Sequence, residues 1–516
     1  MRRQDIQLLA RAKSGDVAAS LEVGRRYLSG IDGFPHHVAT GLDYLAGGAL
    51  RGQVAGAVLV ARALELQDIL ALDQLPSLQK AAAAKESVAM VKLGAWLVAH
   101  APSLAGGLAM LEAAEAIDDQ PAVRKAVALL RGSAPSRRAD ALRALHGEGR
   151  LQCEAVASLA TREAIKNGDV NRIWDSLDVL WTLAPAVTDD MAEVVIIAIT
   201  RNEALGAGSI GLEAAVVEQC LDHRASRNDA YAALLLGKAL CGIDDGVLPP
   251  SALVVGTNVR KGAAMLLRSA DGGCDTAWIH LHRVHSDQHS SVANAQMARF
   301  FLEKAALCGD TLAQRKLGAT ILKASSSVGE SEQGMQWLSA AADKGDISAQ
   351  RLLNSFVLPV EGDPAQAEAA IETLRLEDPL LAWRLRLARD FGLTKLEALC
   401  VDPVVGARTW GLVVGPNAFI QQVKLGSPRA IPASSSSALH SLHGAVAFFK
   451  QFHSERGQFE GDLRKRSVRL RRALVRRELD EDIFFARANT TTLDALRVGA
   501  KWAYRLREPL QSALAA

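Results

Sequence analysis

The sequence contains few aromatic residues and few cysteines. Aromatic side chains make up 5% of its 516 residues, although hydrophobic residues reach 49%, so we expect a core of Ala, Leu and Val between closely spaced helices. The six cysteines are scattered and include no CxxC pair, a distribution typical of reduced thiols in a cytoplasmic protein. No apolar run approaches the roughly 20 residues of a membrane span. No uninterrupted apolar run follows the two N-terminal arginines either. We therefore expect neither a membrane-spanning helix nor a secretion signal.

Excess charge and catalytic motifs are also lacking. The chain has 59 Lys and Arg against 57 Asp and Glu, and this balance predicts no overall attraction to nucleic acid or to a membrane surface. The sequence contains no P-loop, GxSxG, HExxH or paired-carboxylate motif. We therefore expect no enzyme, no cofactor and no metal site. An unfamiliar active site in the C-terminal part would be recognised only as a deep polar pocket with convergent ionisable groups.

A repeat is the strongest feature that the sequence does contain. Three segments align with one another, and their closing glycines, Gly273, Gly309 and Gly345, are 36 positions apart each time. A fixed period in the thirties predicts a stack of helical pairs. We expect each glycine to adopt the left-handed conformation that ends a helix. An aspartate such as Asp310 or Asp346 is expected to cap the helix that follows.

Residues 304–318 and 337–350 resemble the core of the Sel-one-like repeat (SLR), which is related to the tetratricopeptide repeat. The resemblance implies an all-α protein, an α-α superhelix or solenoid of helical hairpins, in which each hairpin buries its apolar face against its neighbours. It also implies an interaction scaffold or adaptor, because members of this family are described as assembling protein complexes in bacterial signalling, envelope and secretion systems.

The register of the repeat divides the chain into four parts. Residues 1–132 carry worn SLR-like repeats, and residues 133–227 continue the solenoid as irregular helical pairs. Residues 228–357 carry the clear repeats. Residues 358–516 are predicted to be a mainly helical C-terminal domain that resembles no family we recognise.

Local patterns predict the elements of this C-terminal domain. Residues 408–414 and 418–424 alternate or run apolar around a Gly-Pro-Asn turn, so they predict a short β-hairpin. Residues 428–437 are predicted to be a loop. The predicted helices cover 365–376, 379–391 and approximately 438–453, 459–479 and 491–513.

The resemblance places the partner, another protein or a peptide, on the concave face formed by the first helices of successive hairpins. Side chains between the small packing residues are expected to line this face. In the first repeat and the last two, these residues are Glu22, Arg26, Tyr27, Gln314, Arg315 and Arg351.

The alternative function is a regulator that binds nucleic acid through the C-terminal domain. Residues 387–401 have the spacing of a helix-turn-helix, although the second helix would offer only three polar side chains to a DNA groove. Residues 464–477 predict a basic helix with one apolar side, which could contact phosphate, RNA or an acidic partner. Acidic residues on both sides of this run also allow an internally salt-bridged face. The candidate contacts are Arg464, Lys465, Arg466, Arg469, Arg472 and Arg476.

Two further patterns are interpreted as ordinary structure. The GxGxxG motif at 205–211 does not follow a strand directly, which favours a helix–helix loop over a dinucleotide site. His282, His285 and His289 would share one helix face, where a pair of histidines can bind zinc or copper. No carboxylate or cysteine at a matching spacing completes that site. His282 also takes the position that Gly318 has in its own repeat, where the helix backbones should meet.

Overall fold

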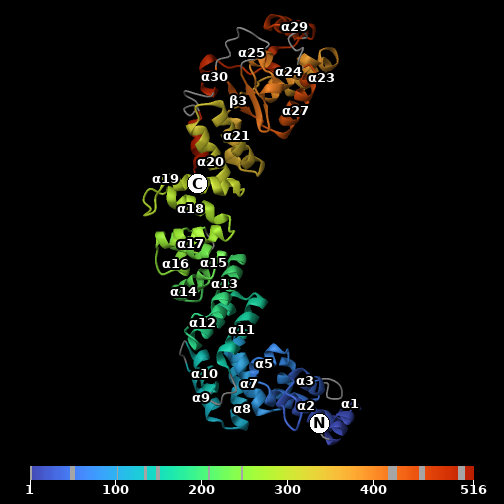
Figure 1. The fold of residues 1–516 in the computed structure, drawn as a ribbon, viewed down its shortest axis with the longest axis vertical. Helices are drawn as coiled ribbons and strands as arrows, with labels where there is room; N and C mark the ends of the chain where they lie inside the picture. The colour runs from blue at the N-terminus through green and yellow to red at the C-terminus, as the bar shows by residue number, and fades with distance from the viewer. Residues whose placement is uncertain are drawn as a thin grey trace. The chain divides into compact units, whose positions relative to one another are not determined.

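The structure is a computed structural model that describes residues 3–46, 53–101, 103–132, 136–146, 152–206, 210–245, 248–415, 427–452, 460–497 and 506–515. The chain forms two compact units, Met1–Cys274 and Asp275–Ala516. Helices dominate both units (Figure 1), which confirms the all-α prediction. None of the described helices has both the length and the apolar character needed to cross a bilayer.

The first unit is a succession of helices around one large core, with a smaller separate cluster of Ala12, Ala19, Val23 and Phe34 near its start. Buried apolar side chains from Leu28 to Val254 form a single cluster, in which Ala, Leu and Val predominate, as the composition predicts. The helices are α1 (Arg3–Lys13), α2 (Val17–Ser29), α3 (Val38–Ala46), α4 (Val54–Ala63), α5 (Leu66–Ala71), α6 (Leu75–Ala83), α7 (Ser87–His100), α8 (Leu104–Ile117), α9 (Pro121–Arg131), α10 (Arg137–Leu145), α11 (Cys153–Asn167), α12 (Val170–Leu183), α13 (Asp189–Ala204), α14 (Ala214–Ser226), α15 (Ala230–Leu240), α16 (Pro250–Leu253) and α17 (Val259–Asp271).

Pairs of glycines allow the two helices of a hairpin to approach closely. A Cβ atom added to Gly107 of α8 would lie 3.3 Å from the carbonyl oxygen of Gly94 in α7, and one added to Gly94 would lie 3.5 Å from that of Gly107. The same reciprocal contact joins α15 to α17 through Gly237 and Gly262, and α2 to α3. The small residues of the repeat are therefore required by the close approach of two backbones.

The second unit continues with helical hairpins and ends in a helical region that contains a small sheet. Its elements are α18 (Thr276–Ser286), α19 (Ala295–Leu307), α20 (Thr311–Ala324), α21 (Val328–Asp343), α22 (Ile347–Asn354), α23 (Pro364–Glu377), α24 (Pro379–Asp390), α25 (Lys395–Cys400), α26 (Pro403–Gly406), β1 (Ala407–Arg408), β2 (Gly411–Val414), β3 (Arg429–Pro432), α27 (Ser436–Lys450), α29 (Leu463–Arg476), η3 (Glu481–Ile483), α30 (Thr490–Leu496) and α32 (Arg507–Leu514).

Two hairpins of this unit differ in how their helices meet. In α20–α21 a Cβ atom added to Gly318 would lie 2.8 Å from the carbonyl oxygen of Gly334. In α18–α19 the corresponding positions hold His282 and Ala298, and Nδ1 of His282 lies 2.9 Å from the Ala298 carbonyl oxygen, to which it donates a hydrogen bond. Burial lowers the pKa of His282, which favours the neutral ring. A hydrogen bond thus replaces the glycine contact in this hairpin.

The three glycines of the 36-residue period have the same conformation. Their φ angles are 91° at Gly273, 92° at Gly309 and 90° at Gly345, in the left-handed region that favours glycine. Asp310 accepts a hydrogen bond from the backbone of α20, and Asp346 accepts one from the backbone of α22. The predicted glycine turns and aspartate caps are therefore confirmed.

A three-stranded antiparallel sheet, in the order β1-β2-β3, lies in the C-terminal region. The strand predicted over 408–414 is confirmed in part, because a turn at 409–410 divides it into β1 and β2. Its predicted partner at 418–424 lies outside the described residues. The loop predicted over 428–437 is wrong at its start, where β3 pairs with β2. This strand is fully buried, and Arg429 in it donates a hydrogen bond to the Gly392 carbonyl at 2.9 Å.

Candidate partner-binding groove

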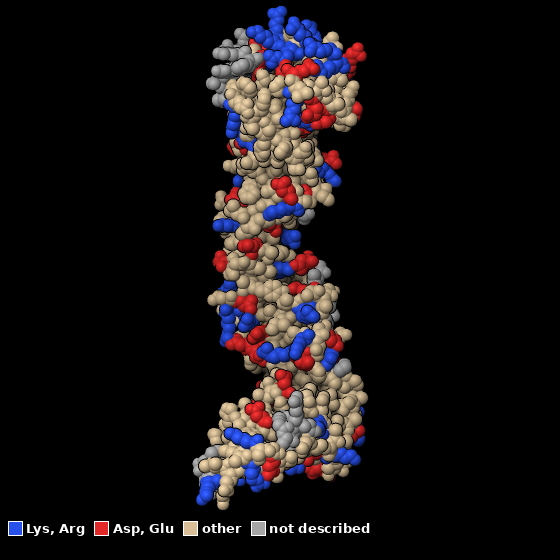
Figure 2. Space-filling view, turned by 90° about the vertical axis from the view of Figure 1, so that its right-hand side faces the viewer, with Lys and Arg blue, Asp and Glu red and all other residues tan. Residues whose placement is uncertain are grey.

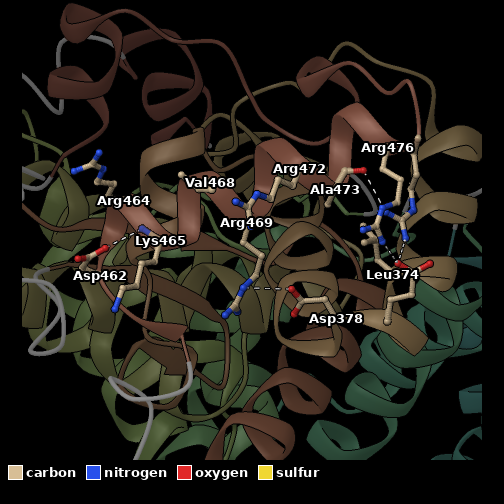
Figure 3. Close-up of a pocket in the computed structure, with 12 residues that line it drawn as sticks. Leu374, Asp378, Asp462, Arg464, Lys465, Val468, Arg469, Arg472, Ala473 and Arg476 are labelled. Carbon is tan, nitrogen blue, oxygen red and sulfur yellow. Dashed lines mark hydrogen bonds and ion pairs between the residues drawn. The ribbon is translucent and has the colours of Figure 1, made fainter.

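A groove of about 710 Å³ runs beside α29 in the second unit (Figure 3). One wall is α29 itself, and the other is the junction of α23 and α24. The lining is strongly cationic. It consists of Leu374, Glu377, Asp378, Asp462, Arg464, Lys465, Val468, Arg469, Arg472, Ala473, Arg476 and Arg477.

The sequence of α29 explains how this helix presents its charges. Asp462 caps the helix by accepting a hydrogen bond from the Lys465 backbone N–H at 2.8 Å. Leu470 and Leu474 are buried in the C-terminal core. Because arginines occupy most of the remaining positions, the other sides of the helix are cationic.

A buried ion network fixes α29 in place. Glu460 accepts two hydrogen bonds from Arg384 of α24, at 2.6 and 2.8 Å, and it lies 3.2 Å from the guanidinium of Arg466. All three side chains are no more than 3% exposed. Arg384 also donates to the carbonyls of Ala398 and Val401. Burial acts to raise the pKa of Glu460, but the arginines around it hold that pKa below its usual range. The network joins α24, α25 and α29.

Only some of the groove cations have partners. Arg469 lies 3.5 Å from Asp378, and Glu377 lies 2.6 Å from Arg477 and 3.4 Å from Arg476. The hydrogen bond from Arg477 is the main cause of the lowered pKa of Glu377.

Arg464 and Arg472 are exposed, and neither has an ion-pair or hydrogen-bond partner among the described residues. Figure 2 shows Lys and Arg gathered on the surface over α29. The exposed cations of this helix are Arg464, Lys465, Arg471, Arg472 and Arg476.

The six arginines and lysines predicted to contact nucleic acid therefore differ in exposure. Arg464, Lys465, Arg472 and Arg476 are exposed, and Arg469 is partly buried beside Asp378. Arg466 is a correction to the prediction. It is 3% exposed and donates to the Leu399 and Gly461 carbonyls, so it cannot contact a ligand on the surface.

The helix-turn-helix spacing of 387–401 corresponds to α24, a turn with Gly392 at φ 54°, and the six-residue helix α25. The polar side chains of α25 are used within the fold. Thr394 and Glu397 form a capping box, Glu397 is buried, and Lys395 pairs with Glu481 at 2.5 Å. This helix therefore presents little to a DNA groove, as its short polar face suggests.

The predicted partner-binding residues of the first repeat lie together on α2, where they also support the fold. Glu22 is bonded to Arg25 and Arg26, and the bond from Arg25 is the main reason that its pKa is lowered to about 2. Arg26 also pairs with Asp5 at 3.1 Å. The ring of Tyr27 packs on Phe34 and Tyr44.

The predicted partner-binding residues of the second unit differ from one another in burial and in their contacts. Gln314 is buried, and its amide donates to the Ala306 carbonyl at 3.2 Å. Arg315 pairs with Asp346 at 3.0 Å and donates to the carbonyls of Ala513 and Ala515 in and after α32. Arg351 on α22 is exposed, and none of the described residues forms an ion pair or hydrogen bond with its side chain.

Two histidines of the cluster form hydrogen bonds with nearby backbone carbonyls. His282 binds the Ala298 carbonyl, and Nδ1 of His285 lies 3.0 Å from the Leu281 carbonyl oxygen. In the described part of the chain, no group of three or more His, Cys, Asp or Glu side chains is placed to hold a metal ion. The GxGxxG motif follows helix α13 and not a strand, and its residues 207–209 lie outside the described ranges.

Sequence reasoning missed the second wall of the groove. Glu377 and Asp378 lie nearly ninety positions before α29 in the chain, and nothing near them marks them as neighbours of the basic run. The one available signal was the Asp-Pro pair at Asp378, which predicts that a helix starts there. It does not predict that this helix start lies opposite the basic helix.

The comparisons with known proteins found similarity to solved structures. No protein-family model matches it, and no curated protein does. It is similar to the crystal structure of c5321, a protective antigen of uropathogenic Escherichia coli with an SLR fold, with 17% identity over 74% of this chain and 85% of that chain and a TM-score of 0.25. It is also similar to a Sel1 repeat protein from Oxalobacter formigenes, with 16% identity, 69% and 90% coverage and a TM-score of 0.23.

Proposed function

We propose that this protein is an interaction scaffold that holds a partner protein, with the groove beside α29 as a binding site. The observation that carries the proposal is the set of exposed cations that the fold does not use. Arg464 and Arg472 line the groove without partners among the described residues, whereas Arg466 on the same helix is buried and fully engaged. Exposed charge beside partly exposed apolar side chains, here Val468 and Ala473, is suited to recognising another protein.

The concave face of the first helices is a second proposed surface for a partner. On it, Arg351 is the predicted residue with the most accessible charge, because Glu22, Arg26 and Arg315 are engaged in ion pairs within their units. Charge reversal by Arg351→Glu should weaken capture of a partner that uses this face. Unchanged capture would remove α22 from the proposed surface.

Affinity capture from the native host with the full-length chain tests the groove. We expect a set of captured proteins that is lost when Arg464 and Arg472 are both replaced by Glu. The matched control is Arg471→Glu, because Arg471 is exposed on α29 but does not line the groove. If the unchanged chain, the double variant and the Arg471→Glu control all captured the same set of proteins, the proposal for this site would be refuted.

Binding of nucleic acid is the second candidate function, because the exposed cations of α29 form a continuous patch (Figure 2). It predicts that the full-length chain shifts an oligonucleotide in a gel at low salt, with an affinity that falls steeply as salt is added. Absence of a shift at low salt would exclude this function.

A further inference from the structure

We propose that the groove beside α29 recognises an extended acidic peptide segment whose carboxylates are spaced about four residues apart. This inference rests on the proposed function, since it assigns the chemical class of the protein segment that the groove would hold.

The groove already shows how it binds carboxylates. Two carboxylates that line it already lie against arginines. Asp378 lies 3.5 Å from Arg469 of α29, and Glu377 lies 2.6 Å from Arg477, the residue that follows this helix. In Figure 3 the side chain of Arg469 extends to Asp378 across the groove. Arg469 therefore shows that an arginine of this helix can pair with a carboxylate of the opposite wall.

The cations without partners define the spacing of the ligand. Arg464 and Arg472 are eight positions apart on α29, which corresponds to about 12 Å at a rise of roughly 1.5 Å per residue. An extended chain advances about 3.1 Å per residue, so acidic side chains four positions apart would reach the two guanidiniums. The partly exposed side chains of Val468 and Ala473 supply apolar contacts for the peptide between them.

The lining favours a peptide over a nucleic acid strand. Glu377, Asp378 and Asp462 also line the groove, and they would repel a ligand that carries a negative charge at every unit of its backbone. None of the twelve described lining residues is aromatic, whereas grooves for single-stranded nucleic acid combine cations with aromatic side chains on which bases stack. An acidic peptide with separated charges brings fewer negative charges near these carboxylates, and it needs no aromatic surface for stacking.

Fluorescence anisotropy with the full-length chain tests the inference directly. The probe is a labelled Gly/Ser peptide with glutamate at every fourth position, and its control has glutamine at the same positions. We expect binding of the glutamate peptide only, weakening as salt is added. Replacing Arg472 by Glu should raise Kd by about tenfold or more, because attraction becomes repulsion inside the groove. Arg471→Glu makes the same change of charge outside the groove and should alter Kd by less than about threefold.

Three results would overturn the inference. They are no binding of the glutamate peptide, an equal effect of Arg471→Glu and Arg472→Glu, and tighter binding of a deoxythymidine oligonucleotide of the same charge. Circular dichroism of both variants verifies that the helices are retained. If the peptide fails while capture of a partner still depends on Arg464 and Arg472, the acidic class is wrong and the scaffold function stands. Loss of both would reject the groove as a protein-binding site.

Discussion

Two adjacent glycines on α8 provide a direct test of how the hairpins are packed. Gly107 is buried against α7, and a Cβ atom added there would lie 2.8 Å from Cγ2 of Val98 and 3.0 Å from its backbone nitrogen. Gly106 is exposed, and a Cβ atom added there would meet only Leu97, at 4.0 Å. The two positions share one helix and differ in what they face.

The expected effects of replacing each glycine by alanine can be separated. Both substitutions gain helix propensity, worth up to about 1 kcal/mol. Only Gly107→Ala forces the α7 and α8 backbones apart, and overpacking of this kind typically costs about 1–3 kcal/mol. The propensity gain cancels in the comparison, so we expect the Gly107→Ala variant to be less stable than the Gly106→Ala variant by about 1–3 kcal/mol.

Hydrogen exchange of peptides that cover α7 and α8 is the appropriate measurement. A chain with two compact units need not unfold in one step, whereas exchange reports the free energy of local opening at the altered hairpin. Faster exchange in α7 and α8 is expected for Gly107→Ala and slower or unchanged exchange for Gly106→Ala. Equal protection in the two variants would show that these helices do not meet through their backbones, and the physical basis of the repeat would be lost.

Three other predictions concern the second unit. Glu460→Gln should destabilise it by about 3–5 kcal/mol in urea unfolding, because two buried guanidiniums lose their carboxylate, whereas the control Glu377→Gln at the surface should cost less than about 1 kcal/mol. The folded-state pKa of Glu460 is lowered, so the stability that its carboxylate contributes is complete above the unfolded pKa of about 4.3 and is lost as pH falls through the folded value. The Glu460→Gln variant should not show this loss of stability in an acid titration. If the variant and the unchanged chain had the same acid unfolding transition, the role assigned to Glu460 would be contradicted. Gly345→Ala should lower the melting temperature, because alanine at φ 90° costs about 1–2 kcal/mol, whereas Gly329→Ala, at an exposed position with nothing within 4 Å of the added Cβ, should not lower it.

The repeat could be predicted from the sequence because its signals are local. Gly309 and Gly345 are required by a backbone conformation, and Asp310 and Asp346 by the unpaired N–H groups of the helix that follows them. Such requirements depend on a few neighbouring residues, so they survive in a single sequence. The sequence also shows that His282 replaces a glycine of the repeat. It does not show that the ring donates a hydrogen bond to the Ala298 carbonyl.

The β3 strand was missed because its burial is not a local property. Arg429 and the flanking prolines, Pro428 and Pro432, suggest an exposed loop. In the structure Arg429 is 1% exposed, and its guanidinium reaches Glu397 at 3.4 Å and the Gly392 carbonyl at 2.9 Å. A buried arginine with distant partners gives the same local pattern as a solvated one.

The basic helix shows the same difficulty at the site itself. Arg466 and Arg472 belong to the same basic run, yet one is buried against Glu460 and the other lies exposed in the groove. Helical spacing places Arg466 on the side of Leu470 and Leu474, but it does not identify the carboxylate that allows an arginine to be buried there. The difference comes from which side of α29 faces Arg384, a residue some eighty positions earlier. A buried arginine stabilises the helix position only if a carboxylate accompanies it, so Glu460 determines which cation belongs to the core. The cations on the opposite side have no such requirement, and they are therefore the ones that a binding function can explain.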